Sequence, residues 1–501
     1  MANIAVVGAG HNGLVCAYYL ARAGHEVSIF EQSPNLGGAC RNERWNSGAV
    51  VSPGANHYGM LNRRIAADMG LWQRGLSIIR ADPQLIVGLG PGESLCLFDD
   101  VEATKDQLAH YNEDDAARVD KFFTDVANVR RVIQSHIFDL SPSLDAFVAD
   151  LNSIEQGLSD RFVINSIDDT LTYYFKSAQA KALFSATTFL YNAPPDEPGT
   201  AFTLAYLSLF DTEGSPGWGI PVGGMGRVTE LMTDCVRELG VTIFRGKRVE
   251  KILIEKQAAV GVKCVGNEIV RANFVVSNAD PYSTYVILAG QSPSSLKLWD
   301  DSKFSGPCAK FNFTYRGAVR PTSIRPDHEG LLKRSAYVYL PTIEYAAEAF
   351  HSATSQGYSA NPYFEFVSPS EFDNSLCSVG TNIGSIYCLF ANYDVISSWN
   401  ETKRSKIKSE VFQCLLEKLN ITDVPERELL DPVDIEFKFG MHKGNVDHGS
   451  MMQGNTFENR NIERRFGIDN LIICGSGSHP GGLVSGVPGF NAAQRILLQL
   501  T

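Results

Sequence analysis

Three glycines near the N-terminus have the spacing of a phosphate-binding loop. Gly8, Gly10 and Gly13 follow the apolar residues 4–7, which predict a short buried strand. Gly8 permits a tight turn, Gly10 lets the backbone approach a pyrophosphate, and Gly13 lets a helix pack closely on the strand. The helix opens at His11 and Asn12, where backbone N–H groups favour an anion. The chemistry expected of these residues is the binding of a dinucleotide.

An acidic residue follows the second predicted strand of the same unit. Residues 27–30 read Val-Ser-Ile-Phe, and Glu31 and Gln32 come directly after them. A carboxylate at this place binds the ribose hydroxyls of an adenosine and repels a 2′-phosphate. The first nucleotide site is therefore expected to accept FAD or NAD and to exclude NADP.

A second pair of glycines lies shortly beyond this acidic residue. Gly37 and Gly38 follow a turn and precede Arg41. The arrangement resembles FAD-dependent oxidoreductases of the glutathione-reductase-like superfamily, whereas NAD dehydrogenases generally lack the second pair. The resemblance implies FAD, held without a covalent link, and adds these three residues to the expected cofactor site.

The C-terminal region contains a further glycine-rich loop between a strand and a helix. Residues 471–474 predict a buried strand, a loop runs from Gly475 to Gly482, and a helix begins near Pro488. We expect the loop beside the ribityl chain or the pyrophosphate. The helix start is expected near the pyrimidine edge of the flavin, where its dipole would stabilise negative charge. Its candidate residues are Gly489, Phe490 and Asn491.

The middle of the chain predicts a third segment of the same domain. A glycine-rich turn at 223–226 precedes an amphipathic helix, and short strands follow up to residue 276. Val249 opens one of these strands and is a candidate for backbone hydrogen bonds to adenine. Because such segments lie at both ends and in the middle of the chain, we expect them to meet in one cofactor domain.

The expected fold class is α/β with an α+β substrate part. It combines a Rossmann-like FAD-binding domain of glutathione-reductase type with an interleaved substrate domain made of a sheet and helices. The discontinuous FAD domain is predicted to comprise residues 1–75, 215–290 and 430–501, and the substrate domain residues 76–214 and 291–429.

Three other patterns are interpreted as structural. Gly88 to Gly92 stands between two apolar runs with no helix after it, which favours a hairpin turn over a second phosphate loop. Aromatic residues are frequent over 173–210 and are expected to fill a core more than to line a substrate tunnel. The basic run 403–408 predicts the solvated end of a helix, with peripheral membrane contact as the weaker alternative.

Composition and net charge limit the binding partners and the cellular location that we expect. The net charge of −12 disfavours binding to nucleic acid or to anionic lipid. Ten cysteines without a Cys-x-x-Cys pair predict neither a redox disulfide nor a metal site and suit a reducing compartment, so we expect an intracellular, cytoplasmic protein. No stretch is apolar enough to predict a transmembrane segment. The sequence does not predict an oligomeric state.

The combined motifs resemble one family over nearly the whole chain. They are similar to those of phytoene-desaturase-related FAD oxidoreductases, closest to the branch that contains pyridine nucleotide-disulphide oxidoreductase domain-containing protein 2. The resemblance implies hydride removal from a substrate carbon to the flavin and a substrate domain like that of monoamine oxidases and carotenoid desaturases. Leu483 stands where this branch usually has a third glycine, and Phe490 where it usually has a basic residue.

Histidines are the candidates for acid–base work, since a neutral imidazole can accept a proton near neutral pH. His448, in a glycine-flanked loop before the C-terminal glycine segment, is the first candidate for a catalytic base, and His57 is the second. Both could instead order their loops. His442 is a weaker candidate, and His479, beside Pro480, is expected to be structural.

The function expected is FAD-dependent oxidation of a small, apolar or aromatic organic molecule at a C–C, C–N or C–O bond. Oxygen or a quinone-like acceptor would reoxidise the flavin. Two alternatives stay open: a redox-neutral FAD-dependent isomerase, and a flavin-bearing interaction protein without catalysis.

Overall fold

A parallel sheet near the N-terminus gives the molecule its first layer. The computed structural model describes residues 1–186, 188, 193–212, 214–292, 305–452, 456–457, 460 and 467–501. Five strands pair in the order β11-β2-β1-β15-β21, all parallel. Their bounds are β1 Asn3–Val7, β2 Glu26–Phe30, β11 Thr242–Phe244, β15 Phe274–Ser277 and β21 Leu471–Ile473. Strands from both ends and the middle of the chain therefore form one sheet.

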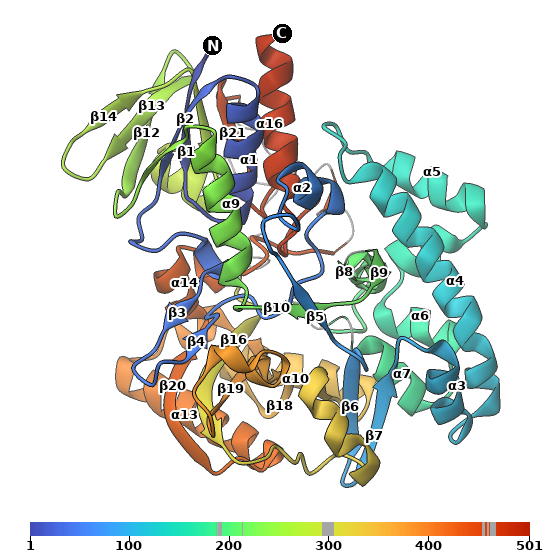
Figure 1. Cartoon of the computed structure of the whole chain (residues 1–501). Coiled ribbons are helices and arrows are strands. Elements are labelled where there is room, and N and C mark those ends of the chain that lie inside the picture. Colours follow the sequence, from blue (N-terminus) through green and yellow to red (C-terminus); the bar gives the residue numbers. More distant parts are fainter. Residues whose placement is uncertain are drawn as a thin grey trace.

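Helices cover one face of this sheet and a small antiparallel sheet covers the other. The helices are α1 (His11–Arg22), α9 (Gly226–Glu238) and α16 (Val487–Leu500), which lie together in Figure 1 with both chain ends above them. On the opposite face lie β12 (Val249–Glu255), β13 (Ala258–Cys264) and β14 (Ile269–Arg271). Apolar residues on both faces explain why the strands are apolar without alternation.

A seven-stranded sheet forms the second layer, shown at the bottom of Figure 1. Its order is β20-β16-β19-β18-β17-β6-β7, antiparallel except between β17 and β6. Helix α13 (Glu401–Leu419) packs on its back through Phe412 and Leu415. The strands are β6 Leu85–Gly90, β7 Glu93–Leu97, β16 Cys308–Arg316, β17 Ala336–Tyr339, β18 Tyr358–Val367, β19 Asn382–Ala391 and β20 Asp423–Leu430.

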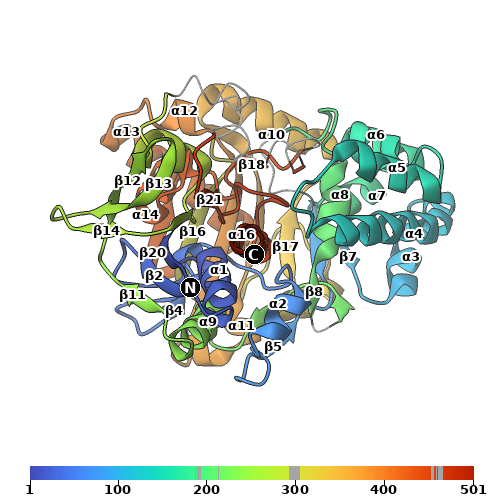
Figure 2. The same cartoon turned by 90° about the horizontal axis from the view of Figure 1, so that it is seen from above.

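A block of helices flanks both sheets, and Figure 2 shows it on one side of the molecule. The helices are α3 Val101–Ala109, α4 Glu113–His136, α5 Leu144–Ile154, α6 Ile167–Tyr174, α7 Ala178–Ser185 and α8 Phe202–Tyr206. Most aromatic residues of this region are buried, for example Phe175, Phe184 and Phe202, while Tyr173 is half exposed. The aromatics of the described part therefore fill a core, as expected; Phe189 and Tyr191 lie outside the described residues.

Short elements connect these layers. They are α2 Arg63–Asp68, α10 Ile343–Gln356, α11 Pro369–Phe372, α12 Tyr393–Ile396, α14 Pro432–Phe439, β3 Glu43–Arg44, β4 Val50–Val51, β5 Ile78–Arg80, β8 Asp211–Thr212, β9 Ser215–Pro216 and β10 Gly219–Pro221.

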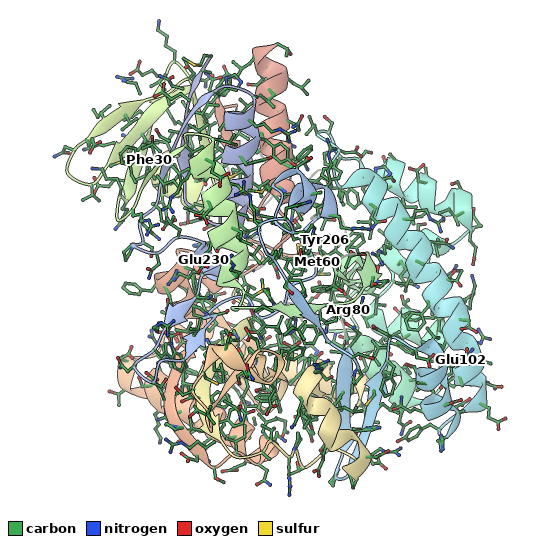
Figure 3. The ribbon with its side chains drawn as sticks, viewed as in Figure 1. Phe30, Met60, Arg80, Glu102, Tyr206 and Glu230 are labelled. Atoms are coloured by element: carbon green, nitrogen blue, oxygen red, sulfur yellow. The ribbon has the colours of Figure 1, made fainter. Side chains whose placement is uncertain are left out.

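Figure 3 places Tyr206 near the centre of the molecule, where its hydroxyl donates a hydrogen bond to the Gly482 carbonyl at 3.4 Å. None of the helices in the described ranges is long and apolar enough to cross a bilayer.

The structure tests two of the local interpretations. Strands β6 and β7 pair antiparallel on either side of Gly92, so the glycine-rich run at 88–92 is a hairpin, as expected. The basic run 403–408 is different, because Arg404 and Lys408 point inward and pair with Asp431 and Asp434. The expectation of a solvated helix end was wrong for these two residues, because the buried Asp431 and the partly exposed Asp434 attract them.

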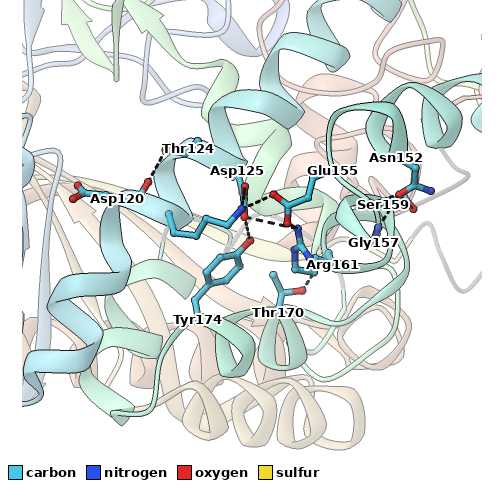
Figure 4. A network of polar contacts seen from close by, with 11 residues as sticks. Asp120, Thr124, Asp125, Asn152, Glu155, Gly157, Ser159, Arg161, Thr170 and Tyr174 are labelled. Carbon is cyan, nitrogen blue, oxygen red and sulfur yellow. Dashed lines mark hydrogen bonds and ion pairs between the residues drawn. The ribbon is translucent and has the colours of Figure 1, made fainter.

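A buried carboxylate ties three parts of the helical block together. Asp125 of α4 accepts a hydrogen bond from the Tyr174 hydroxyl at 2.5 Å and from Lys121 at 2.7 Å (Figure 4). Arg161 lies 3.9 Å from the same carboxylate and pairs with Glu155 at the end of α5. Because Asp125 is fully buried, these partners must compensate its charge.

We expect Asp125→Ala to lower the free energy of unfolding by about 3–5 kcal/mol, since it leaves the Tyr174 hydroxyl without its buried acceptor and removes one of the two carboxylates beside Arg161. Thermal unfolding followed by circular dichroism measures the effect. The matched control is Asp120→Ala one turn earlier, which removes an exposed ion pair with Lys105 and should leave the melting temperature nearly unchanged. Equal losses in both variants would contradict the assignment.

Candidate cofactor and active site

One cavity of about 420 Å³ lies where the two sheets face each other. The carboxyl ends of β1, β2 and β15 open into it, as expected for ligand sites of parallel sheets. On the other side its wall includes Lys310 of β16 and Tyr387 of β19. Ten of the predicted site residues line it: Gly8, Gly10, His11, Asn12, Glu31, Gln32, Gly38, Arg41, Val249 and His448.

The turn between β1 and α1 forms a close-packed cradle. Gly8 has a φ of 94°, which favours glycine. A Cβ at Gly10 would lie 2.7 Å from the Asn278 side-chain nitrogen, and one at Gly13 would lie 2.3 Å from the Gly8 carbonyl oxygen. Helix α1 starts directly behind this turn, so its first N–H groups meet the cavity without side chains in front of them.

Glu31 stands at the end of β2, as its place in the sequence predicts. Its carboxylate accepts hydrogen bonds from the backbone N–H groups of Ala9 and Ser33, both at 2.8 Å. The side chain is 7% exposed and lines the cavity. These two bonds fix the carboxylate beside the glycine turn, where a ribose would follow the pyrophosphate.

The second glycine pair packs on the first. The Gly37 N–H donates to the Ala9 carbonyl at 3.0 Å, and both Gly37 and Gly38 have positive φ. A Cβ at Gly37 would lie 2.4 Å from the Thr229 hydroxyl oxygen of α9. Arg41 is buried in the cavity wall near this pair, and its Nε and one Nη both donate to the same carboxylate oxygen of Glu43, at 3.0 and 2.9 Å.

Seven predicted cofactor residues lie behind the described wall of the cavity: Gly13, Gly37, Gly475, Gly482, Gly489, Phe490 and Asn491. A Cβ at Gly489 would lie 2.2 Å from the Asn12 carbonyl oxygen, so this glycine lets α16 approach α1. Phe490 packs edge-on against Tyr19, and the Asn491 amide donates to the Ile137 carbonyl. The wall in this region is formed by Ser476, Leu483 and Val484 instead.

Leu483 has an unusual backbone conformation in this wall. Its φ is 70°, the left-handed region that a bulky side chain rarely adopts. A glycine would take this conformation without strain. The strain is therefore located directly at the cavity.

Lys310 was not among the predicted site residues. It is 1% exposed, and its ammonium group donates hydrogen bonds to Asn56 at 2.5 Å and to Ser385. The ammonium lies 4.7 Å from the centre of the Tyr387 ring. Burial lowers the pKa of Lys310 to about 7. A lysine with this pKa can gain or lose a proton near neutral pH.

His448, the first candidate for a catalytic base, lies in the cavity wall, in a loop where its φ is 55°. Burial lowers its pKa, so the ring is neutral near pH 7, and Nδ1 has no hydrogen-bond partner in the described part of the chain. The neighbouring Asp447 is also buried in the wall, and burial raises its pKa to about 7. His448 therefore has a ring nitrogen available to a ligand.

His57 lies deeper than the cavity wall. Its Nε2 is 3.4 Å from Glu365, and its ring stacks on Trp218 at 4.1 Å. Burial lowers the pKa of His57 to about 3 and raises that of Glu365 to about 8. His442 stacks on Tyr282, and His479 bonds two backbone carbonyls, as expected of a structural residue.

The described residues fit a bound FAD. A Cβ at Gly10 or Gly13 would collide with Asn278 or with the Gly8 carbonyl, so only glycine keeps this turn tight beside the cavity. Buried His11 Nε2 and Asn12 Oδ1 have no hydrogen-bond partner within the described ranges. Burial lowers the pKa of His11 to about 4, so its ring is neutral at the cradle. When bound, FAD supplies a hydride acceptor that no side chain provides.

Comparisons with known proteins identify the family. The family model of flavin-containing amine oxidoreductases matches residues 13–374. A protein from Rattus norvegicus, pyridine nucleotide-disulfide oxidoreductase domain-containing protein 2, is 26% identical over 99% of this chain and 93% of its own length. A phytoene desaturase from Neurospora crassa is 22% identical over 96% of this chain and 82% of its own length.

A solved structure agrees with the fold. An oxidoreductase from Methanosarcina mazei superposes with a TM-score of 0.63 at 17% identity, over 99% of this chain and 100% of that one. The expected α/β class and the expected resemblance to the phytoene-desaturase-related group are both confirmed. The chain belongs to the flavin-containing amine oxidoreductase family and is an FAD-dependent oxidoreductase.

Proposed function

We propose that the protein oxidises an apolar organic molecule by two electrons: a hydride leaves a carbon atom for the flavin, a proton leaves the neighbouring atom for His448, and a C–C, C–N or C–O double bond forms. One observation carries the proposal: a single cavity joins the glycine cradle of the parallel sheet to Lys310 and Tyr387 of the second sheet. Its wall also includes apolar side chains, among them Val446, Leu483 and Val484. Such a site excludes water and holds an apolar molecule against a bound flavin.

We further propose how the chain holds FAD. Gly8, Gly10 and the first turn of α1 would bind the pyrophosphate, Glu31 the ribose, and Val249 the adenine, without a covalent link. Gly475, Gly482 and the start of α16 would support this site from behind, since they contact Asn278, Asp447 and Asn12. Oxygen or a quinone-like acceptor would take up the electrons.

The reaction is tested with the purified holoprotein under anaerobic conditions. Acid precipitation should release FAD into the supernatant, and apolar amines, alcohols and alkenes from the source organism should be screened for bleaching of the flavin absorbance. A product two hydrogens lighter than the bleaching compound supports the proposal. A product of unchanged mass, formed without use of an acceptor, supports an isomerase instead.

Replacing Glu31 by Arg should abolish the retention of FAD. The variant places a positive charge where the carboxylate now accepts two backbone hydrogen bonds, and it removes the acceptor for the ribose hydroxyls. The ratio of flavin to protein absorbance measures retention, and a circular dichroism spectrum verifies folding. Glu26→Arg, at the exposed start of the same strand, is the control and should keep its flavin. Normal flavin content in Glu31→Arg would refute the ribose assignment.

Replacing His448 by Ala should slow flavin reduction about 10²–10⁴-fold in a single turnover, as loss of a general base does. Flavin content should stay normal, because the backbone of the loop contains the bonds that order it. Stopped-flow absorbance with the bleaching compound measures the rate. His110→Ala, at the exposed end of α3, controls for the loss of an imidazole. An unchanged rate in His448→Ala would exclude a role as catalytic base.

A further inference from the structure

The cofactor cavity opens to the surface along one edge. Most of its described wall is buried or half-buried, and only a few residues of that wall are exposed. These exposed residues are Gln32, Arg248, Glu250, Ile287 and Gly440. They mark the mouth of the cavity. Glu31 and Val249, proposed above to bind the ribose and the adenine, are direct neighbours of this group in the chain. The adenosine half of FAD would therefore lie nearest to the mouth.

The end of α14 forms one side of the mouth. Lys438, Phe439 and Gly440 line the cavity at the point where the helix ends. Gly440 has a φ of 70°, so it turns the chain out of the helix in a conformation that favours glycine. A Cβ at Gly440 would lie 3.0 Å from the side-chain nitrogen of Gln32. The helix end thus narrows the opening through which the adenosine half would pass.

Helix α14 connects the seven-stranded sheet with the glycine-rich loops. It follows β20 directly, and its capping residue Asp431 pairs with Arg404 and Lys408 of α13. Its last turn lies beside β3, which follows the second glycine pair in the chain, and Figure 1 shows the two elements where the sheets meet. A helix fixed at its start holds the mouth narrow only if its end is fixed as well.

An ion pair fixes the end of α14 to the strand beside the glycine loops. The Lys438 ammonium donates to Glu43 of β3 at 2.9 Å and to Glu428 of β20 at 2.5 Å. The other carboxylate oxygen of Glu43 accepts the hydrogen bonds of Arg41, whose guanidinium also lies 5.0 Å from the centre of the Phe439 ring. The side chains of Lys438 and Glu43 are only 15% and 21% exposed. The contact is therefore shielded from much of the solvent, which strengthens it.

The charges in this contact compensate one another. Burial raises the pKa of Glu43, but the hydrogen bonds from Lys438 and Arg41 outweigh it and lower the pKa below its usual range. Glu43 is therefore an anion at neutral pH, and Lys438 lies between two carboxylates. Since these carboxylates already pair with Lys438, the ammonium has little charge left to offer a phosphate of FAD.

We propose that the end of α14 is part of the FAD site, and that the ion pair of Lys438 with Glu43 holds this end at the cavity mouth and thereby slows the release of FAD. Lys438 acts through Glu43 and is a positioning residue. The inference rests on the binding of FAD and does not depend on the oxidation reaction proposed above.

The test measures the release of FAD from the purified holoprotein without substrate. The holoprotein is mixed with an excess of an affinity-tagged apoprotein that binds FAD tightly. The tagged protein is removed at intervals, and the absorbance of the flavin left on the holoprotein gives the rate. Lys438→Met should release FAD about 3- to 30-fold faster than the wild type, since loss of one member of a shielded charge pair speeds dissociation. Lys438→Arg keeps the charge and should release FAD at nearly the wild-type rate.

Lys443→Met is the matched control. Its ammonium pairs with Asp394 at 2.8 Å and its side chain is 12% exposed, but it does not line the cavity in the described structure. The control therefore removes a similar ion pair five residues farther along the chain. It should release FAD at the wild-type rate.

A double variant separates the ion pair from other roles of Lys438. In a Glu43→Gln background, Lys438→Met should cause little further acceleration, because the pair is already broken. An undiminished effect in that background would overturn the proposal, since Lys438 would then act on FAD directly or through Glu428. Release from Lys438→Met at the wild-type rate would overturn it as well.

Two further outcomes are distinguishable. If Lys438→Met does not fold, as judged by circular dichroism, Lys438→Gln replaces it under the same criteria. A wild-type protein that binds no FAD at all would refute the cofactor site itself, whereas a normal flavin content with unchanged release rates in the variants would refute only the role of Lys438.

Discussion

Backbone contacts around the first turn of α1 leave no room for side chains, and the rest of the structure is arranged around them. Gly13 lies against the Gly8 carbonyl, and Gly489 lies against the Asn12 carbonyl. Since β1 is the central strand of the parallel sheet, these contacts fix the N–H groups of α1 at the edge where the neighbouring strands also end. Glu31 and the Gly37–Gly38 pair can reach the same point only because the turn is this tight.

The two faces of the seven-stranded sheet differ in chemistry. One face of β16 presents Phe311 and Phe313 to the apolar core under α13, and the other presents Lys310 and Asn312 toward the cofactor domain. A single strand therefore supplies both the stability of its domain and the polar groups of the site. Those groups are buried, which strengthens the charge interactions among them and makes each missing partner costly.

The cradle could be predicted from sequence because its chemistry depends on local spacing. Gly8, Gly10 and Glu31 lie within one strand–helix–strand unit, and their places follow from the chain itself. Lys310 could not be predicted in this way, since its neighbour at the cavity, Tyr387, lies 77 positions later in the chain and only the pairing of β16 with β19 brings the two together. A signal was present, however: Lys310, Asn312 and Thr314 alternate with aromatic residues, and this pattern suggests a solvated face that the cofactor domain in fact covers. The sequence also predicted cofactor contacts at seven residues that lie behind the cavity wall. Gly489 shows why: a glycine needed for helix packing has the same sequence pattern as one that contacts a ligand.

The contact between α16 and α1 also determines when the nucleotide pocket can fold during synthesis of the chain. The turn at Gly8 to Gly13 leaves the ribosome long before β21 and Gly489, which lie more than 450 residues later in the chain. Until they arrive, the helix behind the cradle has no neighbour at Asn12 and the sheet lacks one edge strand. The nucleotide pocket can therefore close only after α16 has been synthesised, and a chain truncated before α16 would leave α1 with an open, apolar flank.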